Sequence, residues 1–99
     1  MKKRIAILGS TGSIGRQTLE VIDRFPDKFE VTALAAGTNV DEIIRQAQKY
    51  KPKLVSIGQP ENVSRIRSSV PEGTTVSFGI EGMVEAAVLE EVDVVVTSV

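Results

Sequence analysis

The chain contains 99 residues and carries a formal net charge of −1, with 41% hydrophobic and 25% charged residues. This length predicts one domain over residues 1–99, and the composition is that of a folded globular protein rather than a disordered one. The near-neutral charge and the shortage of aromatic residues, with three Phe, one Tyr and no Trp, argue against nucleic acid as a partner.

Cysteine and histidine are both absent from the sequence, which excludes a thiol nucleophile, a zinc ribbon and a Ser-His-Asp triad. We therefore expect any reactive atom to come from a cofactor or from another domain. The apolar run at residues 5–8 is shorter than a secretory signal, which needs about 7–15 apolar residues, or a membrane span of about 20. These features predict a cytoplasmic protein without a membrane partner.

Short apolar runs alternate with amphipathic stretches along the chain. The runs are rich in Val, Ile and Ala and are bounded by Gly, Pro or Lys, which is typical of buried strands, and the stretches between them repeat apolar residues at helical spacing. In chain order, the pattern predicts strand 4–8, helix 13–25, strand 30–36, helix 40–50, strand 54–57, helix 60–69, strand 75–78, helix 81–89 and strand 93–98.

The apolar side of each helix is expected to face the core. In the first helix the residues at helical spacing are Ile14, Thr18, Val21, Ile22 and Phe25, and in the last helix they are Met83, Val84, Ala87 and Val88. Asn39 is placed to cap the second helix with Glu42 as its capping-box partner, and Pro52 follows its end.

The repeated strand–helix–strand order predicts an α/β fold, a doubly wound Rossmann-type parallel sheet of about five strands with helices on both faces. We expect the first three strands in the order 3-2-1 and the last strand beside the first. Strand 75–78 has two possible places, beside the third strand at the far edge or next to the first strand, and we favour the far edge. Because the sequence ends at Val99 in a buried strand, it is expected to be the front part of a longer protein.

Three glycines spaced G-x-x-G-x-x-G follow the first strand and open the first helix. In this context Gly9 permits a sharp turn, Gly12 leaves room for a pyrophosphate, and Gly15 allows the helix to pack close against the sheet. We expect free N–H groups at Thr11, Gly12, Ser13 and Ile14 to bind an anion at the positive end of the helix, with hydroxyl donors at Ser10, Thr11 and Ser13. No lysine follows the third glycine as it does in a P-loop, so a P-loop NTPase is excluded. The remaining alternative is a glycine-rich turn that serves packing alone.

The end of the second strand indicates which dinucleotide binds. Residues 35–39 contain no Asp or Glu to hold a ribose 2′-hydroxyl, so Gly37, Thr38 and Asn39 favour NADP over NAD. Asn39 could act as a helix cap, as a ligand contact, or as both, and Arg16 could reach a phosphate or lie in solvent. At the end of the last strand, residues 97–99 could lie beside a nicotinamide ring or simply end the strand.

Several segments closely resemble the start of 1-deoxy-D-xylulose 5-phosphate reductoisomerases. They are residues 4–15, 17–19, 33–40, 51–55, 79–83 and 93–99. The resemblance implies the NADPH-binding part of an enzyme, both reductase and isomerase, that converts deoxyxylulose phosphate to methylerythritol phosphate in non-mevalonate isoprenoid biosynthesis. It also implies cofactor contacts at Thr11, Gly12, Ser13, Ile14, Gly37, Thr38 and Asn39, although many members carry Lys or Arg where this chain has Thr38.

The resemblance further implies that the ligands for a divalent cation (Mg or Mn) and the site for the phosphorylated sugar substrate lie beyond Val99. The full-length enzyme would be a homodimer, and this chain alone would bind nucleotide without turnover. The glycine spacing also suits a semialdehyde-type or an extended short-chain dehydrogenase, but the catalytic Cys of the former and the Tyr-x-x-x-Lys of the latter are absent. A nucleotide-sensing Rossmann domain without catalytic activity is a third possibility.

Overall fold

The computed structural model describes residues 2–97, so Met1, Ser98 and Val99 lie outside the described part of the chain. Its elements alternate as the sequence predicts. In chain order they are β1 (Lys3–Leu8), α1 (Ser13–Arg24), β2 (Phe29–Ala35), α2 (Val40–Tyr50), β3 (Leu54–Ile57), the 3₁₀ helix η1 (Pro60–Asn62), α3 (Val63–Arg67), β4 (Thr75–Phe78), α4 (Gly79–Val88) and β5 (Val94–Thr97).

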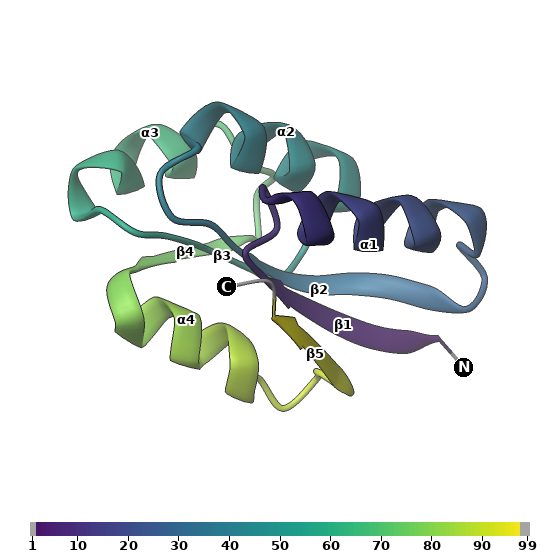
Figure 1. Cartoon of the computed structure of the whole chain (residues 1–99). Helices are drawn as coiled ribbons and strands as arrows, with labels where there is room; N and C mark the ends of the chain where they lie inside the picture. Colours follow the sequence, from purple (N-terminus) through teal and green to yellow (C-terminus); the bar gives the residue numbers. More distant parts are fainter. Residues whose placement is uncertain (1, 98–99) are drawn as a thin grey trace.

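The five strands form one parallel sheet in the order β4-β3-β2-β1-β5. This order confirms the Rossmann-type fold class, the 3-2-1 arrangement and the place of the last strand beside the first. It also confirms the far edge for residues 75–78. Helices α1, α2 and α3 cover one face of the sheet and α4 covers the other (Figure 1). The change of face follows from chirality, because the connection from β4 to β5 crosses the sheet in the opposite direction and must remain right-handed.

The core lies on both faces of the sheet, which explains the continuous apolar runs of the central strands. Along β1, Ile5 and Ile7 belong to the cluster that contains residues of α1 and α2, and Ala6 and Leu8 belong to the cluster that contains Ala86 of α4. The α4 side is built largely from alanine, so this helix approaches the sheet closely. Each helix between residues 2 and 97 is too short or too polar to span a bilayer.

Helix faces are where the sequence analysis was partly wrong. In α1 the buried residues are Gly15, Leu19 and Ile22, whereas Ile14 is 56% exposed and Val21 is 50% exposed. A helix on a sheet buries a narrow stripe, and close approach places a glycine on that stripe in place of a large side chain.

The same correction applies to α4. Its buried residues are Gly82 and Ala86, while Val84 and Val88 are 53% and 70% exposed. A Cβ at Gly82 would lie only 2.1 Å from Oγ of Ser56 in β3, so the helix contacts the sheet through its smallest residues. Met83 and Ala87 do pack against the core as predicted, so the prediction was wrong for Val84 and Val88 only.

The other helices largely follow the predictions. The N–H of Glu42 donates to Oδ1 of Asn39 at 3.2 Å, which confirms the cap of α2. The Glu42 carboxylate instead pairs with Arg45, so the reciprocal half of the capping box is not made. The predicted helix 60–69 is divided into η1 and α3, with Val63 and Ile66 buried.

Candidate functional site

The loop between β1 and α1 turns sharply at Gly9, whose φ of 88° lies in the left-handed region that favours glycine. The N–H groups of Gly9 and Ser10 both donate to the carbonyl oxygen of Ala35, at 2.8 and 2.9 Å. The N–H of Gly12 then donates to the carbonyl oxygen of Gly9 at 3.1 Å and closes a tight turn. The loop is thus anchored to the end of β2 before the helix begins.

The start of α1 has N–H groups available for an anion. The N–H groups of Thr11, Ser13 and Ile14 make no hydrogen bond within residues 2–97, and no side chain caps the helix at Gly12. The expectation of a free N–H at Gly12 was wrong, because that group closes the turn to Gly9. Three donors and the positive end of the helix dipole therefore remain for a ligand.

Ser10 does not present its hydroxyl to a ligand. The residue is fully buried and its Oγ has no hydrogen-bond partner, which contradicts the expectation of a donor there. Its carbonyl oxygen accepts a 3.0 Å hydrogen bond from Nε2 of Gln46, which links the loop to α2. Gln46 was missed by the sequence analysis, and the signal for it was a polar residue on the same helical stripe as Ile43 and Ala47. Hydroxyl donors are left at Ser13, which is exposed, and at Thr11, which is half-buried.

Gly15 holds α1 against this loop. A Cβ at Gly15 would lie 2.3 Å from the carbonyl oxygen of Gly9 and 2.7 Å from Cα of Ser10. These atoms are backbone atoms, which cannot rotate away. The close packing predicted at Gly15 is confirmed, but the nearest backbone is that of the loop and not that of a strand in the sheet.

A second loop, Gly37, Thr38 and Asn39, leaves the end of β2 and is exposed throughout. The N–H of Gly58, after β3, donates to the carbonyl oxygen of Gly37 at 2.8 Å, and a Cβ at Gly58 would lie 2.5 Å from that oxygen. A Cβ at Gly37, by contrast, would meet no atom within 4 Å. Gly58 was missed by the sequence analysis, although a glycine directly after a buried strand is a signal for such close approach.

An apolar cavity of about 230 Å³ joins the two loops, and we call it the edge cavity. It is lined by Gly9, Ala35, Ala36, Gly37, Ile57, Gly58, Gly79, Ile80 and Met83. None of these residues is charged. The Met83 side chain was assigned to the core, and it both packs against the core cluster that contains Ala86 and lines this cavity.

The first two acidic residues after the second loop in the sequence are both ion-paired. Asp41 pairs with Arg65, and Glu42 pairs with Arg45. The Arg45 guanidinium holds the pKa of Glu42 below its ordinary value, so this carboxylate remains ionised and is compensated at neutral pH. The loop itself contains no acidic side chain that would repel a phosphate.

The end of β5 also lies at this edge of the sheet. Thr97 is paired with Leu8, the residue before Gly9, and is exposed. Thr97 therefore lies close to residues 9–12, the loop between β1 and α1, which we call the glycine loop. Ser98 and Val99 lie outside the described residues.

The chain resembles known proteins in both sequence and structure. The sequence profile of the 1-deoxy-D-xylulose 5-phosphate reductoisomerase family matches residues 5–99. The chain is 50% identical over 102 residues to the reductoisomerase of Heliobacterium modesticaldum, covering 100% of this chain and 26% of the relative. It is 43% identical to that of Shouchella clausii, covering 98% of this chain and 26% of the relative. The chain thus spans about a quarter of the length of these relatives.

Solved structures agree with the sequence comparison. A DOX-P reductoisomerase in complex with NADPH, fosmidomycin and magnesium superposes with a TM-score of 0.87 at 33% identity, covering 94% of this chain and 23% of that one. The reductoisomerase of Zymomonas mobilis in complex with NADPH gives a TM-score of 0.83 at 30% identity, covering 90% and 24%. With the family profile matched along almost its whole length, the chain belongs to the 1-deoxy-D-xylulose 5-phosphate reductoisomerase family.

Proposed function

We propose that residues 1–99 form the NADPH-binding part of a 1-deoxy-D-xylulose 5-phosphate reductoisomerase. The observation that carries the proposal is the uncapped start of α1, where the N–H groups of Thr11, Ser13 and Ile14 have no partner within residues 2–97. A pyrophosphate supplies the acceptors that these donors lack. The solved relatives in complex with NADPH support the same assignment.

The residues around the loop have distinct roles in this proposal. Gly9 provides the turn, Gly12 leaves room for the pyrophosphate, and Gly15 keeps the helix start in place. Gly37 borders the edge cavity, whose apolar lining suits the flat adenine ring. The exposed Thr38 and Asn39 then lie on the ribose side, where Thr38 is a donor for the 2′-phosphate and Asn39 also caps α2.

The bound NADPH would supply a hydride, which the full-length enzyme uses in converting deoxyxylulose phosphate to methylerythritol phosphate. The described residues only hold and orient the cofactor. Among residues 2–97, no three His, Cys, Asp or Glu side chains are grouped to hold a metal ion, so these residues do not fit a divalent-cation site. Family membership favours this function over the semialdehyde-type and short-chain dehydrogenases.

The remaining expectations concern the full-length protein. We propose that it binds the phosphorylated sugar through residues beyond this chain, forms a homodimer and is cytoplasmic. The resemblance to the reductoisomerases supports these points. Sedimentation of the full-length gene product would measure the oligomeric state, and a monomer would contradict it.

Calorimetric titration of the chain with NADPH and NADH tests the cofactor assignment. We expect NADPH to bind more tightly than NADH, because no carboxylate follows β2 to hold a 2′-hydroxyl. Gly12→Val should abolish binding with an unchanged circular dichroism spectrum, because φ of −80° and ψ of 176° at Gly12 are accessible to valine. Equal affinity for NADH, or full affinity in the Gly12 variant, would contradict the proposal.

A further inference from the structure

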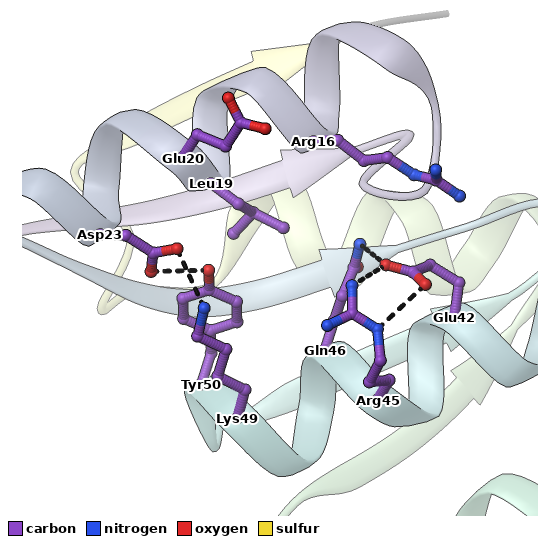
Figure 2. A pocket seen from close by; sticks show the side chains of 9 residues that line it. All are labelled: Arg16, Leu19, Glu20, Asp23, Glu42, Arg45, Gln46, Lys49 and Tyr50. Carbon is purple, nitrogen blue, oxygen red and sulfur yellow. Dashed lines mark hydrogen bonds and ion pairs between the residues drawn. The ribbon is translucent and has the colours of Figure 1, made fainter.

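A groove of about 250 Å³ runs between α1 and α2, and we call it the interhelical groove. It is lined by Arg16, Leu19, Glu20, Asp23, Glu42, Arg45, Gln46, Lys49 and Tyr50 (Figure 2). Both helices follow parallel strands and return on the same face of the sheet, so their first turns lie at the same edge. Arg16 in α1 and Glu42 in α2 accordingly lie at one end of the groove in Figure 2.

The cations of the interhelical groove differ in their partners. Arg45 is paired with Glu42, and Nζ of Lys49 lies 2.9 Å from Oδ2 of Asp23. The Arg16 guanidinium makes no ion pair or hydrogen bond within the described part of the chain, and the residue is exposed. Arg16 is thus the unpaired cation at the end of the groove that holds the first turns of α1 and α2.

The charge of Arg16 acts on the first turn of α2. The pKa of Glu42 is lowered mainly by its hydrogen bond to Arg45, and the charge of Arg16 lowers it further. Glu42 lies three residues after Asn39, which it contacts through its N–H. Arg16 is therefore within electrostatic range of the helix that begins directly after Gly37, Thr38 and Asn39.

A 2′-phosphate placed at this loop carries a charge that the loop itself does not balance, since residues 37–39 contain no cation. We propose that Arg16 is the specificity-determining residue that binds the 2′-phosphate of NADPH, reaching it across the mouth of the interhelical groove. The proposal rests on the proposed function, because it requires the nucleotide to bind along the start of α1. A guanidinium is suited to this role, since it binds phosphate oxygens in pairs and always carries its charge.

The test compares ligands that differ only in the 2′-phosphate. Arg16→Gln should weaken NADPH and 2′,5′-ADP by roughly ten- to a hundredfold, the range expected for a lost charge-assisted hydrogen bond, and should change NADH and 5′-AMP less than about twofold. Arg16→Lys should retain part of the affinity for NADPH. Arg24→Gln is the matched control, because Arg24 lies in the last turn of the same helix and should leave all four affinities unchanged.

The outcomes separate this inference from the proposed function. If the unchanged chain binds NADPH and Arg16→Gln binds it equally well, or loses NADPH and NADH alike, the role of Arg16 is refuted and the cofactor assignment stands. If the unchanged chain binds neither nucleotide, both are refuted. Circular dichroism of each variant shows that the helix is retained, and the Lys variant provides an independent result that does not depend on the Gln variant folding.

Discussion

Replacing Gly15 by alanine would test the packing of the glycine loop most directly. Two effects oppose one another, because alanine stabilises a helix interior by up to about 1 kcal/mol relative to glycine, whereas its Cβ needs space. The structure decides between them. The Cβ would lie 2.3 Å from the carbonyl oxygen of Gly9 and 2.8 Å from the carbonyl carbon of Ser10, well inside van der Waals contact.

Relieving that overlap requires the loop backbone or the whole helix to move by about 1 Å, since no side chain can give way. Overpacking of this kind costs about 1–3 kcal/mol and outweighs the gain in helix propensity. We therefore expect Gly15→Ala to lower the free energy of unfolding by about 1–2 kcal/mol. Because the shift moves the donors at Thr11, Ser13 and Ile14, NADPH affinity should fall as well.

Urea denaturation followed by circular dichroism measures the first effect, and calorimetric titration measures the second. Gly37→Ala is the matched control, because a Cβ there meets no atom within 4 Å and Gly37 has no left-handed φ. That variant should be as stable as the unchanged chain. Finding Gly15→Ala equally stable, or more stable, would refute the packing argument, because only helix propensity would then be acting.

Two further predictions follow from other contacts. Gly37→Val should leave the free energy of unfolding within about 0.5 kcal/mol of the unchanged chain, because a Cβ at Gly37 meets no atom within 4 Å. It should reduce NADPH affinity, because Gly37 lines the edge cavity proposed for the adenosine, and unaltered affinity would argue against adenosine binding there. Asp93, which receives hydrogen bonds from the Arg4 side chain and N–H, has its pKa lowered to about 2 by these bonds. A lowered pKa stabilises the fold above the unfolded value of about 4, and this stability is lost as the pH falls through about 2. Asp93→Asn should therefore lower the melting temperature at pH 7 and have little effect at pH 2, and an equal effect at both values would contradict this assignment.

Local patterns were sufficient to predict most of the architecture. Apolar runs such as residues 94–96 predict strands, and Gly or Pro predicts where a strand or helix ends. Both signals depend only on neighbours in sequence, so the elements and their order along the chain were correctly expected. The place of β4 beside β3 follows from the rule that consecutive strands usually lie adjacent. The glycine spacing similarly placed a turn and a helix start where the structure has them.

Details that depend on contacts distant in sequence were missed or wrong. The N–H of Gly12 is used by the turn, and the Ser10 hydroxyl faces inward, because both depend on how the loop packs on β2 and α2. Gln46 contacts the carbonyl oxygen of Ser10, 36 residues away along the chain, and Gly58 contacts Gly37 of the second loop. The local pattern marks both positions as unusual, but it does not identify the distant residue that each one contacts. Which residues of α4 are buried likewise depends on a distant contact, because Gly82 packs so closely on Ser56 of β3 that no larger side chain fits there.

The sequence by itself determined the α/β class, the order of every strand except β4, and the position of the glycine turn before the first helix. It could do so because hydrophobic period and glycine conformation are properties of short segments. Only the tertiary structure decided which donors stay unpaired, which glycines have room for a side chain, and that Arg16 lies beside the start of α2 without an ionic partner in the described residues. These properties arise where separate segments meet, and close packing there depends on differences of less than 1 Å.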